Sequence, residues 1–189
     1  MEAMRGIFDG SLCLFVHAQD VRQITESVHF KRQMGIENLV IVGGYDAPLV
    51  ADLLRENKVP VMLKRVHTLP RFAEDDVDLP YRLPKLLEDE GVLYCLQNAG
   101  DMEHMGTRNL PFYAGTAHAY GLTYEQAVKS ITLSAARILG VDAFCGSLET
   151  GKDATLFISD GDALDMRTNY LTNAFIQGRS IDLDNRQCQ

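Results

Sequence analysis

The chain has 189 residues, 46% of them hydrophobic, and its 26 acidic and 18 basic side chains give a formal net charge of −8. The apolar fraction is typical of a folded globular domain and excludes an intrinsically disordered chain. The negative charge, with adjacent basic residues only at Lys31-Arg32 and Lys64-Arg65, argues against nucleic acid as a partner. No run of about 20 apolar residues occurs, so we expect no membrane-spanning helix and no membrane partner.

The first half of the chain predicts four short strands, because its apolar runs are typical of strands that are buried on both faces of a parallel sheet. These runs are 12–18, 39–43, 59–63 and 92–97. The segments between them predict helices. Asp20 is the expected N-cap of the first helix and Gly35 its end, Pro48 is the expected start of the second, and the third is expected from Pro84 to Glu90.

The second half of the chain predicts helices followed by β structure. A helix is expected over 111–121, and a capping box formed by Thr123 and Gln126 opens one further long helix. The segment 147–158 predicts a β-hairpin, and 174–181 predicts a single strand that a glycine interrupts. The β structure is therefore expected to form a small unit at the C-terminal end of the chain.

The repeated strand–helix pattern leaves two architectures open, an open doubly wound sheet and part of a (βα)8 barrel. No G-x-G-x-x-G or Walker motif favours nucleotide binding, and no Cys-x-x-Cys pair suits zinc. In a partial barrel, the outer strands have unpaired apolar edges. Such edges pair with other strands, and we therefore expect a homo-oligomer or a complex with another chain.

A family resemblance is carried mainly by the C-terminal part of the sequence. The stretch ITLSAARILGVDAFCGSLETGKDATLFISDGDALD, followed by AFIQGR, resembles the C-terminal end of metal-dependent amidohydrolases of the imidazolonepropionase and dihydroorotase type. Upstream, RNLPFYAGTAHAYGLTYEQAVKSIT resembles the helices after the last barrel strand of these enzymes. FVHA resembles their histidine-bearing fifth strand, so the resemblance extends over nearly the whole chain.

The resemblance implies an α/β fold in two parts. Residues 1–140 are expected to form a partial (βα)8 TIM barrel, equivalent to strands five to eight, and 141–189 a small C-terminal β appendage that belongs to a composite β-sandwich. It also implies a zinc cofactor and a small-molecule substrate. The parent reaction is metal-assisted hydrolysis of a C–N bond in a cyclic amide, a cyclic amidine or a blocked amino acid.

The resemblance makes His17, at the end of the first strand, a candidate metal ligand. Where the family carries a second histidine on the next strand, this sequence ends the strand with Val-Gly-Gly-Tyr. The family's catalytic aspartate on strand eight is replaced by Asn98, which cannot take a proton from water as a carboxylate does. Asp101, three residues further on, is the candidate substitute, so Asn98 and Asp101 are the candidates for the catalytic position.

Four more residues are expected to contact the substrate from loops at the same end of the sheet: Tyr45, Arg65, His67 and Arg108. The two arginines suit a carboxylate, because a guanidinium group binds it through two parallel hydrogen bonds. The acidic run 74–78 is expected to be a solvated loop.

These departures from the family pattern lead to three hypotheses. A catalytic zinc takes three protein ligands and a water, and one dependable ligand remains here. The first hypothesis is therefore a fragment of an amidohydrolase that is inactive alone. The second is a non-catalytic ligand-binding pseudoenzyme. The third is a half-barrel that is completed by a separate N-terminal chain carrying the missing His-x-His pair.

Overall fold

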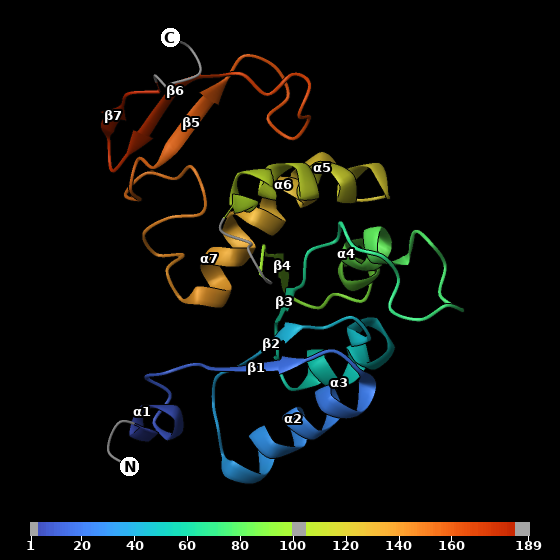
Figure 1. Cartoon of the computed structure of the whole chain (residues 1–189). Coiled ribbons are helices and arrows are strands. Elements are labelled where there is room, and N and C mark those ends of the chain that lie inside the picture. The colour runs from blue at the N-terminus through green and yellow to red at the C-terminus, as the bar shows by residue number, and fades with distance from the viewer. Residues whose placement is uncertain (1–3, 100–104, 184–189) are drawn as a thin grey trace.

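The computed structural model describes residues 4–99 and 105–183. Within these ranges, a four-stranded parallel sheet with its helices is followed by a three-stranded antiparallel sheet (Figure 1). The strands of the parallel sheet are β1 (Leu14–Ala18), β2 (Leu39–Gly43), β3 (Val61–Leu63) and β4 (Tyr94–Leu96). All four predicted strands are therefore present, and the fold class is α/β as predicted.

The strand order distinguishes the two architectures that the sequence leaves open. The order is β1-β2-β3-β4, and each neighbouring pair is parallel. A doubly wound sheet reverses its strand order at a switch point, and this sheet contains no such reversal among its four strands. The sequential order is that of consecutive strands in a (βα)8 barrel.

Helices connect and cover the strands, and local capping fixes several of their ends. They are α1 (Arg5–Phe8), α2 (Val21–Met34), the 3-10 helix η2 (Ala47–Val50), α3 (Ala51–Glu56), α4 (Leu79–Asp89), the 3-10 helix η4 (Thr107–Asn109), α5 (Leu110–Ala119), α6 (Tyr124–Ile131) and α7 (Leu133–Leu139). The predicted cap of α2 is confirmed, because the Asp20 side chain accepts a hydrogen bond from a backbone N–H of the first turn and Gly35 ends the helix with φ 66°. The capping box of Thr123 and Gln126 at the start of α6 is also confirmed. Across the described ranges, no helix is both long and apolar enough to cross a bilayer.

Three helix predictions differ from the structure in extent. Pro48 lies in the 3-10 helix η2, which precedes α3. Helix α4 begins more than one turn earlier than predicted and contains Pro84. Pro84 is buried together with Leu83 and Leu87, and this apolar burial offsets the backbone hydrogen bond that an internal proline removes. The long helix expected after the capping box is two helices, because the backbone at Thr132 (φ −123°, ψ −92°) leaves the helical region.

The C-terminal strands pair differently from the prediction. They are β5 (Leu156–Ser159), β6 (Leu171–Ile176) and β7 (Arg179–Ile181), and they form an antiparallel sheet in that order. The segment 147–153 is a loop, so the predicted hairpin over 147–158 is wrong. The single strand predicted over 174–181 is also wrong, because Gln177 (φ 51°) and Gly178 (φ 76°) form a two-residue turn between β6 and β7.

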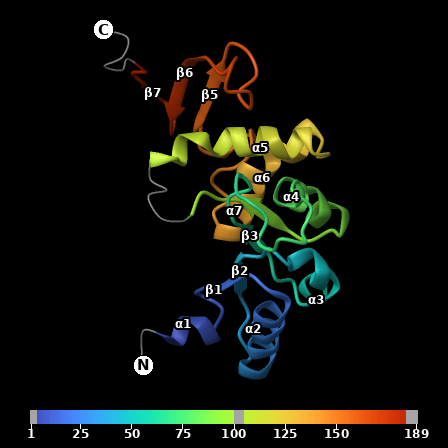
Figure 2. The same ribbon diagram turned by 45° about the vertical axis from the view of Figure 1, so that its right-hand side comes forward.

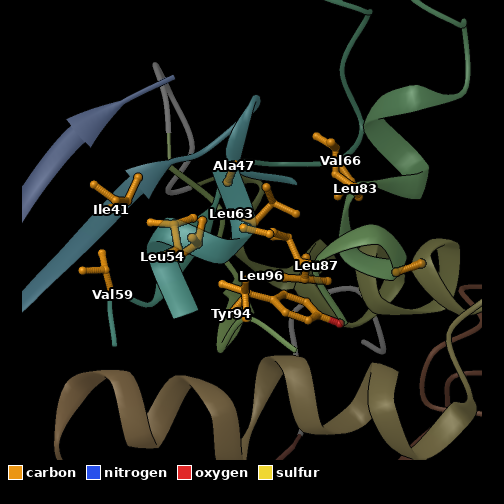
Figure 3. Close-up of a cluster of buried hydrophobic side chains, with 14 of the residues drawn as sticks. Ile41, Ala47, Leu54, Val59, Leu63, Val66, Leu83, Leu87, Tyr94 and Leu96 are labelled. Atoms are coloured by element: carbon orange, nitrogen blue, oxygen red, sulfur yellow. The ribbon is translucent and has the colours of Figure 1, made fainter. Parts of the chain in front are cut away.

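The face of the parallel sheet that points toward the helices forms the main hydrophobic core (Figure 3). Ile41, Leu63 and Leu96 project from three strands into this core and meet Leu54 of α3 and Leu87 of α4. All five side chains are at most 4% exposed. Each buried side chain of this size contributes about 1.5–3 kcal/mol, so this layer holds the strands in place.

The opposite face of the sheet, which is the inner face of a barrel, is covered in part by α7. Val40, Met62 and Cys95 pack there against Ala135 and Ile138 of α7. Helix α7 lies on the side where the strands begin (Figure 1). At the carboxyl-terminal end of this face, His17 of β1 is exposed and marks the place for a functional site.

The antiparallel sheet lies apart from the parallel sheet, and α5 and α6 lie between the two in both views (Figures 1 and 2). The loop before β6 anchors the sheet to α5. Leu164 in this loop is 6% exposed and belongs to the main core. Its carbonyl oxygen lies 2.3 Å from where a Cβ of residue 115 would be, so only a glycine at position 115 permits this approach.

Candidate functional site

The inner face of β1 is exposed at its carboxyl-terminal end. Leu14, Val16 and Ala18 alternate toward the helices and pack in or against the main core. Phe15 and His17 therefore point to the inner face, where Phe15 is 41% exposed and His17 is also exposed. Barrel enzymes carry their active-site groups at the carboxyl ends of the strands, and this end of the sheet is the candidate site.

The strand register shows which residues lie beside His17. His17 is paired with Val42, Val42 with Met62, and Met62 with Cys95. Val42 and Met62 have no titratable side chain. Burial raises the pKa of the Cys95 thiol to about 12, so this thiol stays protonated at neutral pH. His17 is therefore the one ready metal ligand in this row.

The parallel ladder continues one residue beyond β3 and β4. The Lys64 N–H donates to the Gly43 carbonyl (3.0 Å), and the Gln97 N–H donates to the Leu63 carbonyl (3.3 Å). Because side chains alternate along a strand, Lys64 and Gln97 lie on the same inner face as His17. We call His17, Lys64 and Gln97 the strand-end group.

Gly43 is the last residue of β2 and belongs to the Val-Gly-Gly-Tyr segment that ends this strand without a histidine. Its φ of 117° disfavours any residue with a side chain, and a Cβ would lie 2.4 Å from Gln19 Nε2 and 2.9 Å from the Ala18 carbonyl oxygen. Gln19 is held in place by the Tyr45 N–H, which donates to its Oε1 (3.4 Å). A side chain at position 43 therefore requires both the backbone and Gln19 to move.

The amide side chains that follow β4 are engaged in hydrogen bonds. Gln97 Nε2 donates to the Met62 carbonyl (2.7 Å), and the Tyr113 hydroxyl of α5 donates to Asn98 Oδ1 (3.1 Å). Asn98 thus lies just beyond the end of β4, with its side chain bonded to α5. The other candidate for this position, Asp101, lies outside the described residues.

His67 lies against helix α5. Its Nε2 is 2.6 Å from Thr116 Oγ1, whose single proton is donated to the Phe112 carbonyl (3.1 Å). With that proton engaged, Nε2 carries the hydrogen of the neutral ring and donates it to Thr116. Burial, and secondly the charge of Arg65, lowers the pKa of His67, and the ring meets Tyr113 edge-on at 4.7 Å. His67 is therefore a neutral side chain that ties its loop to α5.

Tyr45 ties the same loop to the end of β2. Its hydroxyl donates to Asp75 Oδ2 (2.7 Å) and accepts a hydrogen bond from the Arg71 N–H (3.1 Å). Asp75 Oδ2 also accepts from the Phe72 N–H (3.1 Å), and Arg71 lies 3.8 Å from Asp20. Burial and the Asp75 carboxylate raise the pKa of Tyr45. The prediction of a wholly solvated loop over 74–78 is therefore wrong at Asp75.

The two arginines predicted to bind substrate are placed differently. Arg65 is half-buried next to Lys64, and its charge acts on His67. Arg108 is exposed in the 3-10 helix η4, just before α5. Among the described residues, no hydrogen bond or ion pair joins Arg108 to Tyr45 or His67. The structure thus brings Arg65 close to His67.

The model of the Amidohydrolase family matches residues 39–182, which is most of the chain. The chain belongs to the amidohydrolase family. The resemblance read from the C-terminal sequence is thereby confirmed. Among curated proteins, none matches the chain significantly.

Solved amidohydrolase structures share the fold of this chain. An amidohydrolase from Thermotoga maritima is 28% identical with a TM-score of 0.85, and the match covers 96% of this chain and 46% of that one. A prolidase complexed with N-methylphosphonate-L-proline is 19% identical (TM-score 0.67), covering 94% of this chain and 47% of that one. A Xaa-Pro dipeptidase with bound methionine is 17% identical (TM-score 0.68), covering 96% and 47%. This amidohydrolase chain therefore spans about half the length of these structures.

The amidohydrolase family is generally metal-dependent, but the residues at this site do not fit a metal ion. Within residues 4–99 and 105–183, no group of three or more His, Cys, Asp or Glu side chains is arranged to hold one. The strand-end group offers one imidazole, and the charge of Lys64 on the same face opposes a cation. The described residues of this chain therefore do not by themselves form a metal centre of the family type.

Proposed function

We propose that this chain forms one half of an amidohydrolase barrel, equivalent to strands five to eight, and that it does not hydrolyse a substrate by itself. The observation that carries the proposal is the strand-end group, in which His17 is accompanied by an ammonium group and an amide. A catalytic zinc takes three protein ligands and a water. The match to 46% of the Thermotoga maritima chain supports a half-barrel, with 141–189 as part of a composite β-sandwich.

The parent reaction that we propose is metal-assisted hydrolysis of a C–N bond in a small molecule, with zinc as the metal that the resemblance implies. The substrate class is a cyclic amide, a cyclic amidine or a blocked amino acid. The neighbours named as a prolidase and a Xaa-Pro dipeptidase favour the blocked amino acid. The ligands of these two structures, N-methylphosphonate-L-proline and methionine, both carry an amino-acid carboxylate.

Elemental analysis of the purified chain after dialysis tests the absence of hydrolysis and of bound metal, with His17→Ala as the control. We expect well below one equivalent of zinc in both proteins. We also expect no hydrolysis of N-acetyl-L-proline or dihydroorotate above the rate in buffer. One equivalent of zinc that is lost in His17→Ala, together with hydrolysis by the unaltered chain, overturns the proposal.

We further propose that a different (βα)4 unit, and not a second copy of this chain, completes the barrel. Within the described ranges, β1 and β4 each have one neighbour, so their outer edges are open to pairing. Ala135 and Ile138 of α7 already fill the inner face where the strands begin. A twofold axis along the barrel would bring two copies of α7 into the same space. The partner must therefore lack a helix in this position.

A further inference from the structure

We propose that the strand-end group binds the carboxylate of a small molecule and that the ammonium group of Lys64 is its main binding group. This inference rests on the proposed function, because it requires that no metal occupies this end of the sheet. It goes beyond that function by assigning the charge of the ligand and the residue that recognises it. Lys64 is exposed and follows β3 on the inner face.

The strand ends offer a cation very few free ligand atoms. Gly43 has no side chain, and its backbone and surroundings exclude one. Asn98 already accepts a hydrogen bond from the Tyr113 hydroxyl through its Oδ1. The side-chain amide of Gln97 is engaged, because its Nε2 donates a hydrogen bond to the Met62 carbonyl of β3. Lys64 places a positive charge on the same face, so the donor set at this end suits an anion.

The described acidic side chains around this end of the sheet do not neutralise the charge of Lys64. Asp20 caps α2 and lies 3.8 Å from Arg71. Asp46 accepts a hydrogen bond from a backbone N–H at the start of α2 (3.2 Å). Asp75 accepts from a tyrosine hydroxyl (2.7 Å). Among the described residues, Lys64 forms no ion pair with any of the three, and its charge is available to a ligand.

A carboxylate suits the spacing of the donors. Neighbouring strands lie about 4.8 Å apart and each residue advances about 3.3 Å along a strand, so the backbone of Lys64, two residues beyond Met62 in the row of His17, lies about 12 Å from that of His17. An extended lysine side chain and one carboxylate bridge such a gap. The ammonium group supplies three N–H donors and the imidazole of His17 another. An ion pair of this kind forms charge-assisted hydrogen bonds, which are about twice as strong as neutral ones.

Titration of the whole chain, followed by NMR at low ionic strength, tests the inference with two probes. N-acetyl-L-proline and its neutral analogue N-acetyl-L-prolinamide differ only in the carboxylate, so the ratio of their dissociation constants isolates the effect of charge. Lys64→Gln removes the ammonium group. Lys58→Gln is the matched control, because Lys58 is an exposed lysine at the opposite end of the same strand.

We expect saturable binding of the carboxylate that is about ten-fold tighter than binding of the amide, a factor equivalent to one charge-assisted hydrogen bond. Lys64→Gln should weaken carboxylate binding by about the same factor, and Lys58→Gln should leave it unchanged. Equal affinity for the two probes, failure to saturate, or the same loss in both variants overturns the inference.

A second arm with EDTA separates this outcome from a failure of the proposed function. A carboxylate that is bound through a metal ion is released by EDTA, and that result overturns the proposed function together with the inference. Carboxylate binding that survives EDTA but is insensitive to Lys64→Gln overturns the inference alone. Binding that survives EDTA and is lost in Lys64→Gln supports both.

Discussion

The hydroxyl of Tyr45 ties the loop between β3 and α4 to the end of β2, and Tyr45→Phe should release this loop locally. The variant loses the hydrogen bond to the Asp75 carboxylate and the one from the Arg71 N–H. A hydrogen bond to a charged group contributes about 1.5–3 kcal/mol and a neutral one about 1 kcal/mol, and partial exposure favours the lower values. A loss of about 2 kcal/mol for the pair increases the open population of the loop about 30-fold.

Limited proteolysis measures this opening, because trypsin cleaves after Arg71 only when the loop leaves the surface. When opening is fast relative to cleavage, the rate of cleavage follows the open population, so we expect it to rise about 30-fold in Tyr45→Phe. Tyr120→Phe removes the same atom from a partly exposed tyrosine and serves as the control. The reasoning is refuted if both variants are cleaved at the rate of the unaltered chain. It is also refuted if urea unfolding shows that Tyr45→Phe lowers the free energy of unfolding of the whole domain by the same amount, about 2 kcal/mol.

Two further predictions concern pH and association. The pKa of His67 is lowered in the folded chain, so its contribution to stability is present above about pH 6.5 and is lost as the pH falls through 6.5 toward the folded pKa. The urea midpoint should therefore decrease more between pH 7.5 and 5.5 in the unaltered chain than in His67→Gln, and equal decreases contradict this. Sedimentation equilibrium of the purified chain should show no discrete dimer, because two copies of α7 cannot share the inner face; a stable closed dimer contradicts the proposed partner.

The parallel sheet could be predicted because its signals are local. Four short apolar runs predict the strands, and the capping residues Asp20 and Thr123 predict two helix starts. Both signals depend only on neighbouring residues in the sequence. The C-terminal strands could not be predicted in the same way. Lys152 Nζ donates to Ser147 Oγ (2.6 Å), which in turn donates to Glu149 Oε1 (2.6 Å), so the segment closes on itself and does not pair as a strand. Such side-chain bonds depend on loop geometry that a hydropathy pattern does not contain.

For the candidate site, the sequence predicts strand ends and the loops that follow them, but not which face of the sheet each side chain occupies. His17 and Asn98 remain candidates, proposed from the family resemblance and from strand ends that can be read from the sequence. Lys64 was missed, although counting by twos from Met62 along β3 would have placed it on the inner face. The sequence does not predict a role for Gln19. Its side chain lies against the backbone of Gly43 on the neighbouring strand β2, and helix α2 separates the two residues in the sequence.

The features that separate this site from a metal site are linked to one another through hydrogen bonds. Gln19 lies over Gly43 only because residue 43 has no side chain, and the same Gln19 accepts the Tyr45 N–H. Tyr45 in turn holds Asp75 and thereby the loop that begins at Lys64. A histidine at position 43 would displace Gln19 and leave the Tyr45 N–H without this acceptor, and its side chain would point to the same side as Ala18, away from His17. One substitution is therefore insufficient to restore a metal ligand here, and the carboxyl-terminal end of this sheet has a stable arrangement of its own that favours an anion.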